Sequence, residues 1–272
     1  MGSLYLNRLS HQEREELKNK LFEIQHGKCF ICEDPMDLSV HSVQIDYVIP
    51  TKMGGTVDLS NLALAHSSCN ESKQDADLRV ARILARFNKI REACLKENRV
   101  PNLTDIFLRY GGSKSELPLE LDGNNEIVKY SLSNGEDRQV YEERVYTDAL
   151  SGFKYFFAEL PIEYLFHDDR INPRSIGQNI SKLVKEFFLK RPQLHISLGW
   201  VEEEDNKKSR IKIFDGQHKA AAQVLLGVKR LPVRVFLNPD LDVLLTTTSP
   251  PFIVYFVFKN AFCIFPASHS SG

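Results

Sequence analysis

The sequence predicts an α+β protein in which a small metal-stabilised domain precedes a mixed domain of helices and strands. Three observations support this fold class. Two pairs of zinc-type ligands enclose a strand and a loop near the N-terminus. Segments with the apolar spacing of helices alternate with short β-rich runs. A polar, turn-rich stretch separates two parts of the 272-residue chain, which gives two domains of ordinary size.

The composition excludes several classes of protein. The chain is 42% hydrophobic and 26% charged, as in soluble globular proteins, and its net charge of −1 gives no overall attraction to nucleic acid or membranes. Five cysteines are too few for a disulfide framework, so we expect a reducing, cytoplasmic location. No stretch resembles a signal peptide or an uninterrupted membrane span of about 18 residues.

The elements follow one another from the N-terminus. Ser10 and Glu13 form a capping box that begins a first helix, and Gly27 ends that helix. A cysteine-bearing turn, a strand at 43–49 and a long helix from about 70 to 98 come next. The expected organisation is a first domain at 1–110, a hairpin-like connector at 111–152, a second domain at 153–240 and a C-terminal tail at 241–272.

Four residues with metal-binding side chains occur as two pairs, Cys29 with Cys32 and His66 with Cys69. Each pair has a two-residue spacing, and together the pairs supply the four ligands of a closed tetrahedral zinc site. The turn-forming sequence around Cys29 and Cys32 also favours a zinc knuckle. The alternative is a pair of buried cysteines and a surface histidine.

The stretch around these pairs resembles the HNH endonuclease family. An aspartate, a proline, a Gly-Gly pair, an Asn-Leu pair and a Cys-Asn-x-x-Lys ending follow one another as in zinc-knuckle members, with His66 in place of one zinc cysteine. The matching residues are Asp46, Pro50, Gly54, Gly55, Asn61, Leu62, Cys69, Asn70 and Lys73. The resemblance covers about residues 20–75 and implies a zinc-bound ββα-metal fold that cuts DNA.

By this resemblance, Asp46 and Asn70 would hold a catalytic Mg²⁺ or Mn²⁺ ion, and Asn61 would orient the general base. The residues themselves agree in part, because an aspartate at a strand end and an asparagine at a helix start both offer the oxygen atoms that hard cations prefer. Such an ion would neutralise the scissile phosphate and stabilise the leaving oxygen. Without the surrounding pattern, Asn70 is a plain helix N-cap.

Tyr47 stands where the family places its histidine general base. A phenol ionises near pH 10, so it is a poor proton acceptor at neutral pH. His41 lies too far along the predicted strand to replace it. Tyr47 therefore marks a weakened enzyme, an inactive variant or a phenol whose acidity is changed by its surroundings. The alternative is a tyrosine simply packed at a strand end.

A basic stripe is predicted on the long helix, because Arg79, Arg82, Arg86 and Lys89 recur at helical spacing. Together with Lys73, these residues would suit contacts to DNA phosphates. A solvated helix face explains the same spacing.

The sequence IKIFDGQHKAAAQVLLG (211–227) predicts a strand, a tight turn and a helix. Cations in the first turn of that helix oppose its macrodipole. A bound phosphate removes the conflict, since free N–H groups, dipole and cations then face an anion. We predict that the phosphate of a nucleotide or nucleic acid is bound by Asp215, Gly216, Gln217, His218 and Lys219. The alternative is an exposed turn that tolerates a small destabilisation.

Residues 153–238 also resemble the ParB-like DGQHR families, with HDDRINPRSI (167–176) similar to their upstream arginine box and Lys219 in place of the usual arginine. The sequence changes character near Ser249, which indicates a truncated or frame-altered C-terminus. Together the resemblances predict a metal-dependent HNH-type DNA endonuclease fused to a ParB-like domain, with a role in DNA defence or restriction. The alternative is a catalytically inactive, zinc-stabilised protein that binds DNA or a nucleotide.

Overall fold

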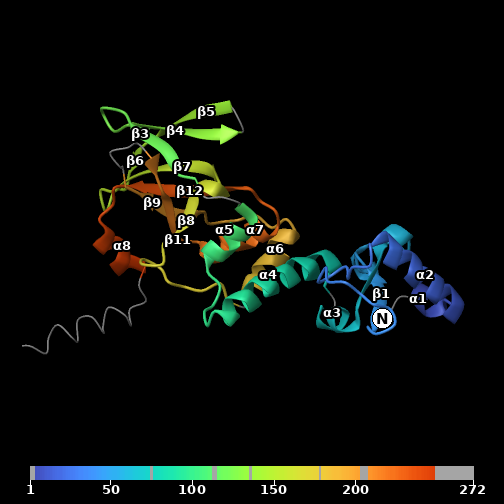
Figure 1. Cartoon of the computed structure of the whole chain (residues 1–272). Coiled ribbons are helices and arrows are strands. Elements are labelled where there is room, and N and C mark those ends of the chain that lie inside the picture. Colours follow the sequence, from blue (N-terminus) through green and yellow to red (C-terminus); the bar gives the residue numbers. More distant parts are fainter. Residues whose placement is uncertain are drawn as a thin grey trace, which may run out of the picture. The chain divides into compact units, whose positions relative to one another are not determined.

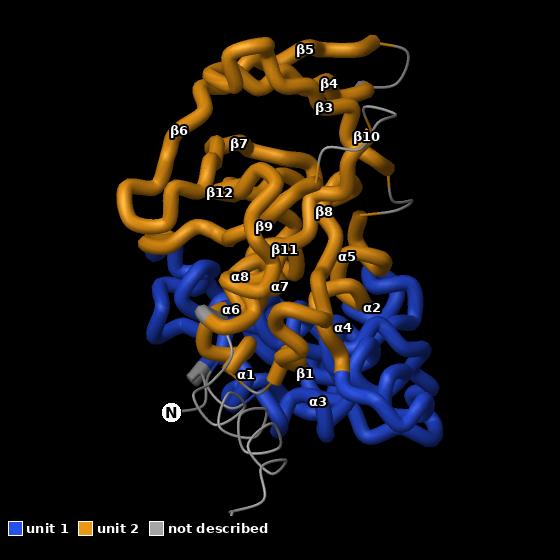
Figure 2. The backbone as a smooth tube through the Cα atoms, turned by 90° about the vertical axis from the view of Figure 1, so that its left-hand side faces the viewer, with its two compact units in different colours: residues 1–100, 184–191 blue, residues 101–183, 192–272 orange. Residues whose placement is uncertain are grey.

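The computed structural model describes residues 4–73, 76–111, 115–134, 137–177, 179–202 and 208–248. The chain forms two compact units (Figure 2). Unit 1 contains residues 1–100 and 184–191, and unit 2 contains residues 101–183 and 192–272. The change of character predicted near Ser249 lies outside the described residues. None of the described helices has the length and apolarity to cross a membrane.

Unit 1 places its helices around a two-stranded antiparallel sheet (Figure 1). Ser10 forms the predicted capping box with Glu13, so the second helix begins directly after it. In the sheet, Asp46 pairs with Ala63 and Tyr47 pairs with Leu62. The elements of this unit are α1 (Leu4–Arg8), α2 (His11–Ile24), β1 (Val43–Tyr47), β2 (Leu62–His66), α3 (Ser67–Ser72) and α4 (Leu78–Lys96), with short 3₁₀ turns at Thr51–Met53 and Leu59–Asn61.

The long helix predicted from about 70 to 98 is two helices, α3 and α4. Asp77 separates them and is itself buried at 3% exposure. Its side chain accepts a hydrogen bond from the backbone N–H of Arg79, so it caps the start of α4. The apolar face predicted for this region is present in α4, where Val80 and Phe87 are buried.

The segment after β1 is fixed by Asn61 and two glycines. The Asn61 amide donates to the carbonyl oxygens of Ile49 (3.1 Å) and Thr56 (2.7 Å), and it accepts from the Ile49 N–H (2.8 Å). Gly54 has φ of +87°, and a Cβ atom at Gly55 would lie 1.8 Å from the Ile49 carbonyl oxygen. Both positions therefore require glycine.

Unit 2 contains a six-stranded mixed sheet in the order β6-β7-β12-β9-β11-β8 and a four-stranded antiparallel sheet in the order β10-β3-β4-β5 (Figure 1). Its strands are β3 (Leu117–Leu121), β4 (Ile127–Asn134), β5 (Asp137–Arg144), β6 (Tyr146–Thr147), β7 (Lys154–Pro161), β8 (Leu165–His167), β9 (Ser197–Val201), β10 (Lys208–Ser209), β11 (Ile211–Asp215) and β12 (Arg230–Leu237). Its helices are α5 (Leu103–Gly111), α7 (Gln217–Leu225) and α8 (Leu241–Thr248), and a 3₁₀ turn covers Ile162–Tyr164. The helix α6 (Ile180–Phe188) begins in unit 2, and its residues from 184 onward cluster with unit 1.

The stretch predicted as a connecting hairpin, 111–152, lies within unit 2. It supplies β3, β4 and β5 of the smaller sheet and β6 of the larger one. The ring of Tyr130 in β4 lies 6.2 Å from that of Phe156 in β7, and the Ser133 N–H donates to the Tyr164 hydroxyl at 3.1 Å. These contacts join the smaller sheet to the rest of the unit.

The start of the predicted tail also belongs to the fold. Leu244 of α8 is buried in a cluster with Trp200 and Phe214. The helix therefore closes one part of the apolar core of unit 2.

A buried carboxylate holds the segment that follows β8. Asp168 is 4% exposed and accepts hydrogen bonds from the Trp200 indole (2.9 Å) and the Arg170 guanidinium (3.1 Å). Burial by itself raises the pKa of Asp168, but the hydrogen bonds and charge of Arg170, together with Trp200, lower it overall. The ionised Asp168 thus anchors the arginine-box segment, which also contains Asn172 and Arg174.

Candidate functional site

The four predicted zinc ligands meet in unit 1. The ligand atoms of Cys29, Cys32, His66 and Cys69 all lie within 4.8 Å of one another. The distance from Cys32 Sγ to His66 Nδ1 is 3.4 Å. Two ligands of a tetrahedral zinc ion, with bonds of about 2.3 and 2.0 Å, are expected roughly 3.5 Å apart. The geometry of the group therefore fits zinc.

Local backbone bonds shape the knuckle that carries the first two ligands. The Cys29 N–H donates to the Asp34 carbonyl and the Glu33 N–H donates to the Cys29 carbonyl, both at 2.9 Å. Glu33 takes the left-handed conformation, with φ of +65°, which closes the turn. The other two ligands come from the end of β2 and from α3.

The electrostatics of this group also favour a metal ion. Burial raises the pKa of the thiols of Cys32 and Cys69, and the neighbouring Cys29 raises it further. Protein groups alone therefore keep these cysteines protonated. A bound cation reverses that preference, because a thiol that coordinates zinc loses its proton.

The predicted basic stripe contacts the knuckle. Arg86 donates to both carboxylate oxygens of Glu33, at 2.9 and 2.5 Å, and Lys89 donates to Asp34 at 2.6 Å. These partners lower the pKa of Glu33 and of Asp34. Both acidic residues directly follow Cys32 in the knuckle, so Arg86 and Lys89 hold the knuckle against α4.

The other two stripe residues also have partners. Arg82 donates to the Phe30 carbonyl at 2.6 Å, and its guanidinium lies 3.7 Å from the centroid of the Phe30 ring. Arg79 pairs with the capping residue Asp77 at 2.7 Å. The stripe therefore has a structural role, and its predicted contact with DNA stays a prediction.

A second polar group is formed by β1 and α3. Gln44 and Asp46 are two residues apart in β1, so their side chains share one face of the strand. The Asn70 amide donates to Gln44 Oε1 at 2.7 Å, and Lys73 Nζ lies 2.9 Å from Asp46 Oδ2. Asn70 thus contacts Gln44, and Lys73 contacts Asp46, on one face of β1, while the joint role of Asp46 and Asn70 at a metal ion stays a prediction.

The oxygen of Asn70 is the most informative atom of this group. Asn70 Oδ1 is buried and accepts no hydrogen bond from any residue that the structure describes. A buried polar atom without a partner destabilises a fold by about 1–3 kcal/mol. An amide oxygen and a carboxylate are donors that suit a hard divalent cation such as Mg²⁺ or Mn²⁺, and Asp46 shares the face of β1 that carries Gln44, the partner of Asn70. The residues present therefore fit such an ion.

Lys73 neutralises Asp46 in this structure. The side chain of Lys73 is 7% exposed, and that of Asp46 is 27% exposed. The second carboxylate oxygen of Asp46 accepts the Tyr47 N–H at 2.7 Å. Because a carboxylate accepts about four hydrogen bonds or ligand bonds in total, both oxygens keep free lone pairs.

Tyr47 occupies a different environment from its neighbour. It is 4% exposed and belongs to the hydrophobic core of unit 1. Tyr47 is the last residue of β1, and it lines one pocket together with Asp46. His41, the other candidate base, lies with its ring 5.0 Å from that of His66, beside the zinc group.

In unit 2, the predicted phosphate-binding turn is fixed on both sides. Gly216 has φ of +78°, and a Cβ atom there would lie 2.9 Å from Ser197 Cα. Gln217 is 3% exposed, and its amide donates to the Asn172 carbonyl at 3.0 Å. These two residues therefore position the turn, while Asp215 is exposed at its edge.

His218 and Lys219 differ in charge. The ring of His218 accepts the Gly177 N–H at 3.3 Å. Burial lowers the pKa of His218, and the nearby Arg174 lowers it further, so the ring is neutral at neutral pH. Lys219 is the cation of the first turn of α7.

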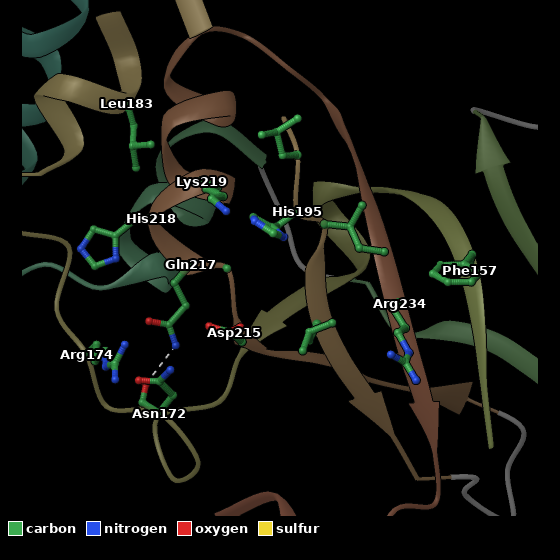
Figure 3. A pocket seen from close by; sticks show the side chains of 14 residues that line it. Phe157, Asn172, Arg174, Leu183, His195, Asp215, Gln217, His218, Lys219 and Arg234 are labelled. Atoms are coloured by element: carbon green, nitrogen blue, oxygen red, sulfur yellow. Dashed lines mark hydrogen bonds between the residues drawn. The ribbon is translucent and has the colours of Figure 1, made fainter. Parts of the chain in front are cut away.

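A pocket of about 690 Å³ opens beside this turn (Figure 3). It is lined by the whole turn from Asp215 to Lys219 and by several residues that sequence reasoning missed. These include Phe157, Asn172, Arg174, His195 and Arg234. Arg174 lies in the arginine-box segment, and that resemblance was the available signal for it.

The segment that carries the four zinc-type ligands matches a known protein family. Residues 29–76 match the HNH endonuclease family. An HNH domain therefore lies in unit 1, and its range includes the four zinc-type ligands, Asp46, Asn61 and Asn70. The family implies a nucleic-acid substrate in general. No curated protein matches the chain. The ParB-like resemblance of unit 2 stays a prediction.

The first testable prediction concerns zinc in the HNH domain. Freshly purified, reduced protein should carry about one zinc ion per chain, and chelation should unfold this domain because zinc binding drives the folding of such sites. Elemental analysis and circular dichroism measure both effects. Cys32→Ala should lose the metal, whereas Cys94→Ala, a buried cysteine outside the group, should keep it. Reduced wild-type protein without zinc would contradict the assignment.

The second prediction concerns Gln44, which holds the amide of Asn70. Gln44→Ala should weaken binding of Mn²⁺ by about 10- to 100-fold, the usual effect of removing a group that orients a metal ligand. Electron paramagnetic resonance on zinc-loaded protein measures free and bound Mn²⁺ directly.

Two variants control this experiment. Gln44→Glu keeps an acceptor for the Asn70 amide and should retain binding. Gln12→Ala removes an exposed glutamine of α2 and should have no effect. Wild-type Mn²⁺ affinity in Gln44→Ala would show that Gln44 does not position the site.

Proposed function

We propose that the HNH domain is a metal-dependent DNA endonuclease domain whose cleavage is slowed or abolished by Tyr47. The observation that carries this proposal is the buried, unpartnered Asn70 Oδ1. Asn70 contacts Gln44, which shares a face of β1 with Asp46, and it lies on the same helix as Cys69 of the zinc-type cluster.

The residues of this group have separate roles in the proposal. Asp46 and Asn70 hold a divalent ion, which neutralises the scissile phosphate and stabilises the leaving oxygen when it is bound. Gln44 orients Asn70 through its amide. Lys73 balances the charge of Asp46 before metal binding and contacts a DNA phosphate afterwards, because a second cation beside Asp46 weakens its hold on Lys73. Asn61 fixes the segment between β1 and the two glycines.

What the group lacks is a proton acceptor for the attacking water. Tyr47 stands at the position of the family's base, and its side chain is buried in the core. Losing a general base typically lowers a rate by about 10²- to 10⁴-fold. The buried tyrosine is also the observation that favours the second candidate for this domain, a DNA-binding unit that does not cleave.

The third prediction tests the base. Wild-type protein should bind DNA and Mn²⁺ but nick plasmid slowly or not at all. Tyr47→His should raise the nicking rate by part of the roughly 10²- to 10⁴-fold contribution of a general base. Plasmid nicking with Mg²⁺ and Mn²⁺ measures the rates, and zinc content and thermal unfolding show whether the variant is folded.

Asp46→Ala in the Tyr47→His background provides the control, since it should remove the gain together with Mn²⁺ binding. Full-rate cleavage by the wild type would mean that another group acts as the base. A folded Tyr47→His variant that binds DNA and Mn²⁺ without cutting would support the non-catalytic candidate.

For unit 2, we propose a ParB-like role as a binding site for the phosphate of a nucleotide or of DNA, consistent with a function in DNA defence. The support is a pair of cations that face one pocket. Within the part of the chain that the structure describes, Arg174 and Lys219 line the pocket beside the start of α7 and neither has an ion-pair partner. The free N–H groups of a helix N-terminus favour an anion at that place.

The fourth prediction is that inorganic tripolyphosphate raises the melting temperature of the zinc-loaded protein. Replacing both Arg174 and Lys219 by alanine should abolish the shift, because both cations are removed. Replacing Lys182 and Lys190 by alanine removes the same number of charges outside the pocket and should preserve the shift. Differential scanning fluorimetry measures it, and no stabilisation of the wild type by tripolyphosphate would contradict the site.

A further inference from the structure

A row of side chains crosses the six-stranded sheet of unit 2 and ends at the Asp215 turn. Strand pairing places Phe157 of β7 beside Arg234 of β12, and Arg234 beside Leu198 of β9. Leu198 in turn pairs with Asp215 of β11, where the register shifts after Ile213. Directly paired residues point to the same face of a sheet. All four line the pocket of about 690 Å³. With strands about 4.8 Å apart, the row extends over roughly 14 Å.

Phe157 gives the far end of this row an exposed aromatic surface. The side chain is 45% exposed, although it is large and apolar. The rings of Tyr155 and Tyr146 contact it edge to face, with centroids 5.5 and 5.9 Å away. Such neighbours hold the ring in place, so that one flat aromatic surface remains available for stacking. Figure 3 shows Phe157 and Arg234 on strands across the pocket from Arg174 and His218.

Arg234 makes the middle of the row rigid. Its guanidinium lies 3.7 Å from the ring centroid of Tyr155 and 4.7 Å from that of Phe236, and it donates to Asp148 at 3.1 Å. A planar cation held between rings and a carboxylate keeps one orientation. Together with Leu198, it forms a firm floor between the aromatic end and the turn.

The opposite end of the row has the chemistry of an anion site. Arg174 and Lys219 supply two positive charges there, and the start of α7 supplies backbone N–H groups. Asp215 is the carboxylate among the residues that line the pocket. A carboxylate repels a phosphate but accepts hydrogen bonds from sugar hydroxyls, so it suits the part of a ligand between base and phosphate.

We propose that this pocket binds a phosphate that carries a nucleobase, with the base stacked on Phe157 over the Arg234–Leu198 floor and the phosphate held by Arg174 and Lys219. The inference rests on the phosphate site proposed above and adds the base platform to it. A free nucleotide and a nucleotide of a DNA strand share this chemistry. Stacking on an aromatic ring tolerates any base, because every base has a flat π face.

The test compares probes with and without a base on the zinc-loaded, full-length protein. ATP, inorganic tripolyphosphate and a 5′-phosphorylated tetradeoxyadenylate are titrated by calorimetry. Phe157→Ala should weaken binding of the base-bearing probes by about 5- to 150-fold, the range for loss of one stacked base. Its affinity for tripolyphosphate should stay unchanged. Leu194→Ala removes another exposed apolar residue of the pocket, one that lies outside the row, and should leave all three affinities unchanged.

A second variant reports the stacking itself. Phe157→Trp should keep the affinity for ATP and add an exposed indole to a chain whose one natural tryptophan, Trp200, is fully buried. Binding of ATP should quench its fluorescence, whereas tripolyphosphate should not. Thermal unfolding shows that the variant is folded before ligand is added.

The outcomes distinguish failure of the base platform from failure of the phosphate site. Equal affinity for ATP and tripolyphosphate, with no effect of Phe157→Ala, would overturn the base platform and leave the phosphate site standing. No binding of any probe would overturn both. Preference for ATP supports the platform with a free nucleotide as ligand, and preference for the tetradeoxyadenylate supports it with a DNA strand as ligand.

Discussion

Three cysteine thiols and a histidine share a small space in unit 1, with ligand atoms within 4.8 Å of one another, and a bound cation would relieve this crowding of buried polar groups. Without one, burial keeps the thiols of Cys32 and Cys69 protonated, and backbone hydrogen bonds together with the contacts of Arg86 and Lys89 hold the knuckle. With one, the knuckle, the end of β2 and the start of α3 are joined at a single point. Arg86 and Lys89 extend this junction to α4 through Glu33 and Asp34.

The same junction bears on the position of Asn70. Asn70 directly follows Cys69 in α3. A zinc ion that holds Cys69 would therefore also hold Asn70 at one position along β1. Gln44 then sets the rotation of its amide. Structural and catalytic ions would therefore depend on one helix. Tyr47 lies outside this dependence, because it packs into the core, where a tyrosine adds apolar contact without disturbing the metal ligands.

In unit 2, a buried carboxylate and hydrogen bonds fix the positions of pocket residues. Its described residues contain no metal-type cluster. Asp168, which is buried and ionised, holds the segment that carries Asn172 and Arg174, and Gln217 ties Asn172 to the start of α7. These hydrogen bonds fix the backbone that carries Arg174 and Lys219, and the side chains of both residues line the pocket. This is how a site gains a fixed arrangement of charge before any ligand arrives.

The sequence by itself determined the features that depend on local spacing and on side-chain chemistry. These are the four zinc-type ligands, the capping box at Ser10 and the Gly54-Gly55 pair after β1. The sequence did not reveal the break between α3 and α4. The capping residue Asp77 is buried, but in the sequence it has the spacing of a polar residue on an exposed helix face. Only the tertiary structure placed Gln44 against Asn70 and aligned Phe157, Arg234, Leu198 and Asp215 in one row. The physical reason is that the register between strands distant in the chain follows from packing of the whole sheet, and one residue of slip would send every side chain of a strand to the other face.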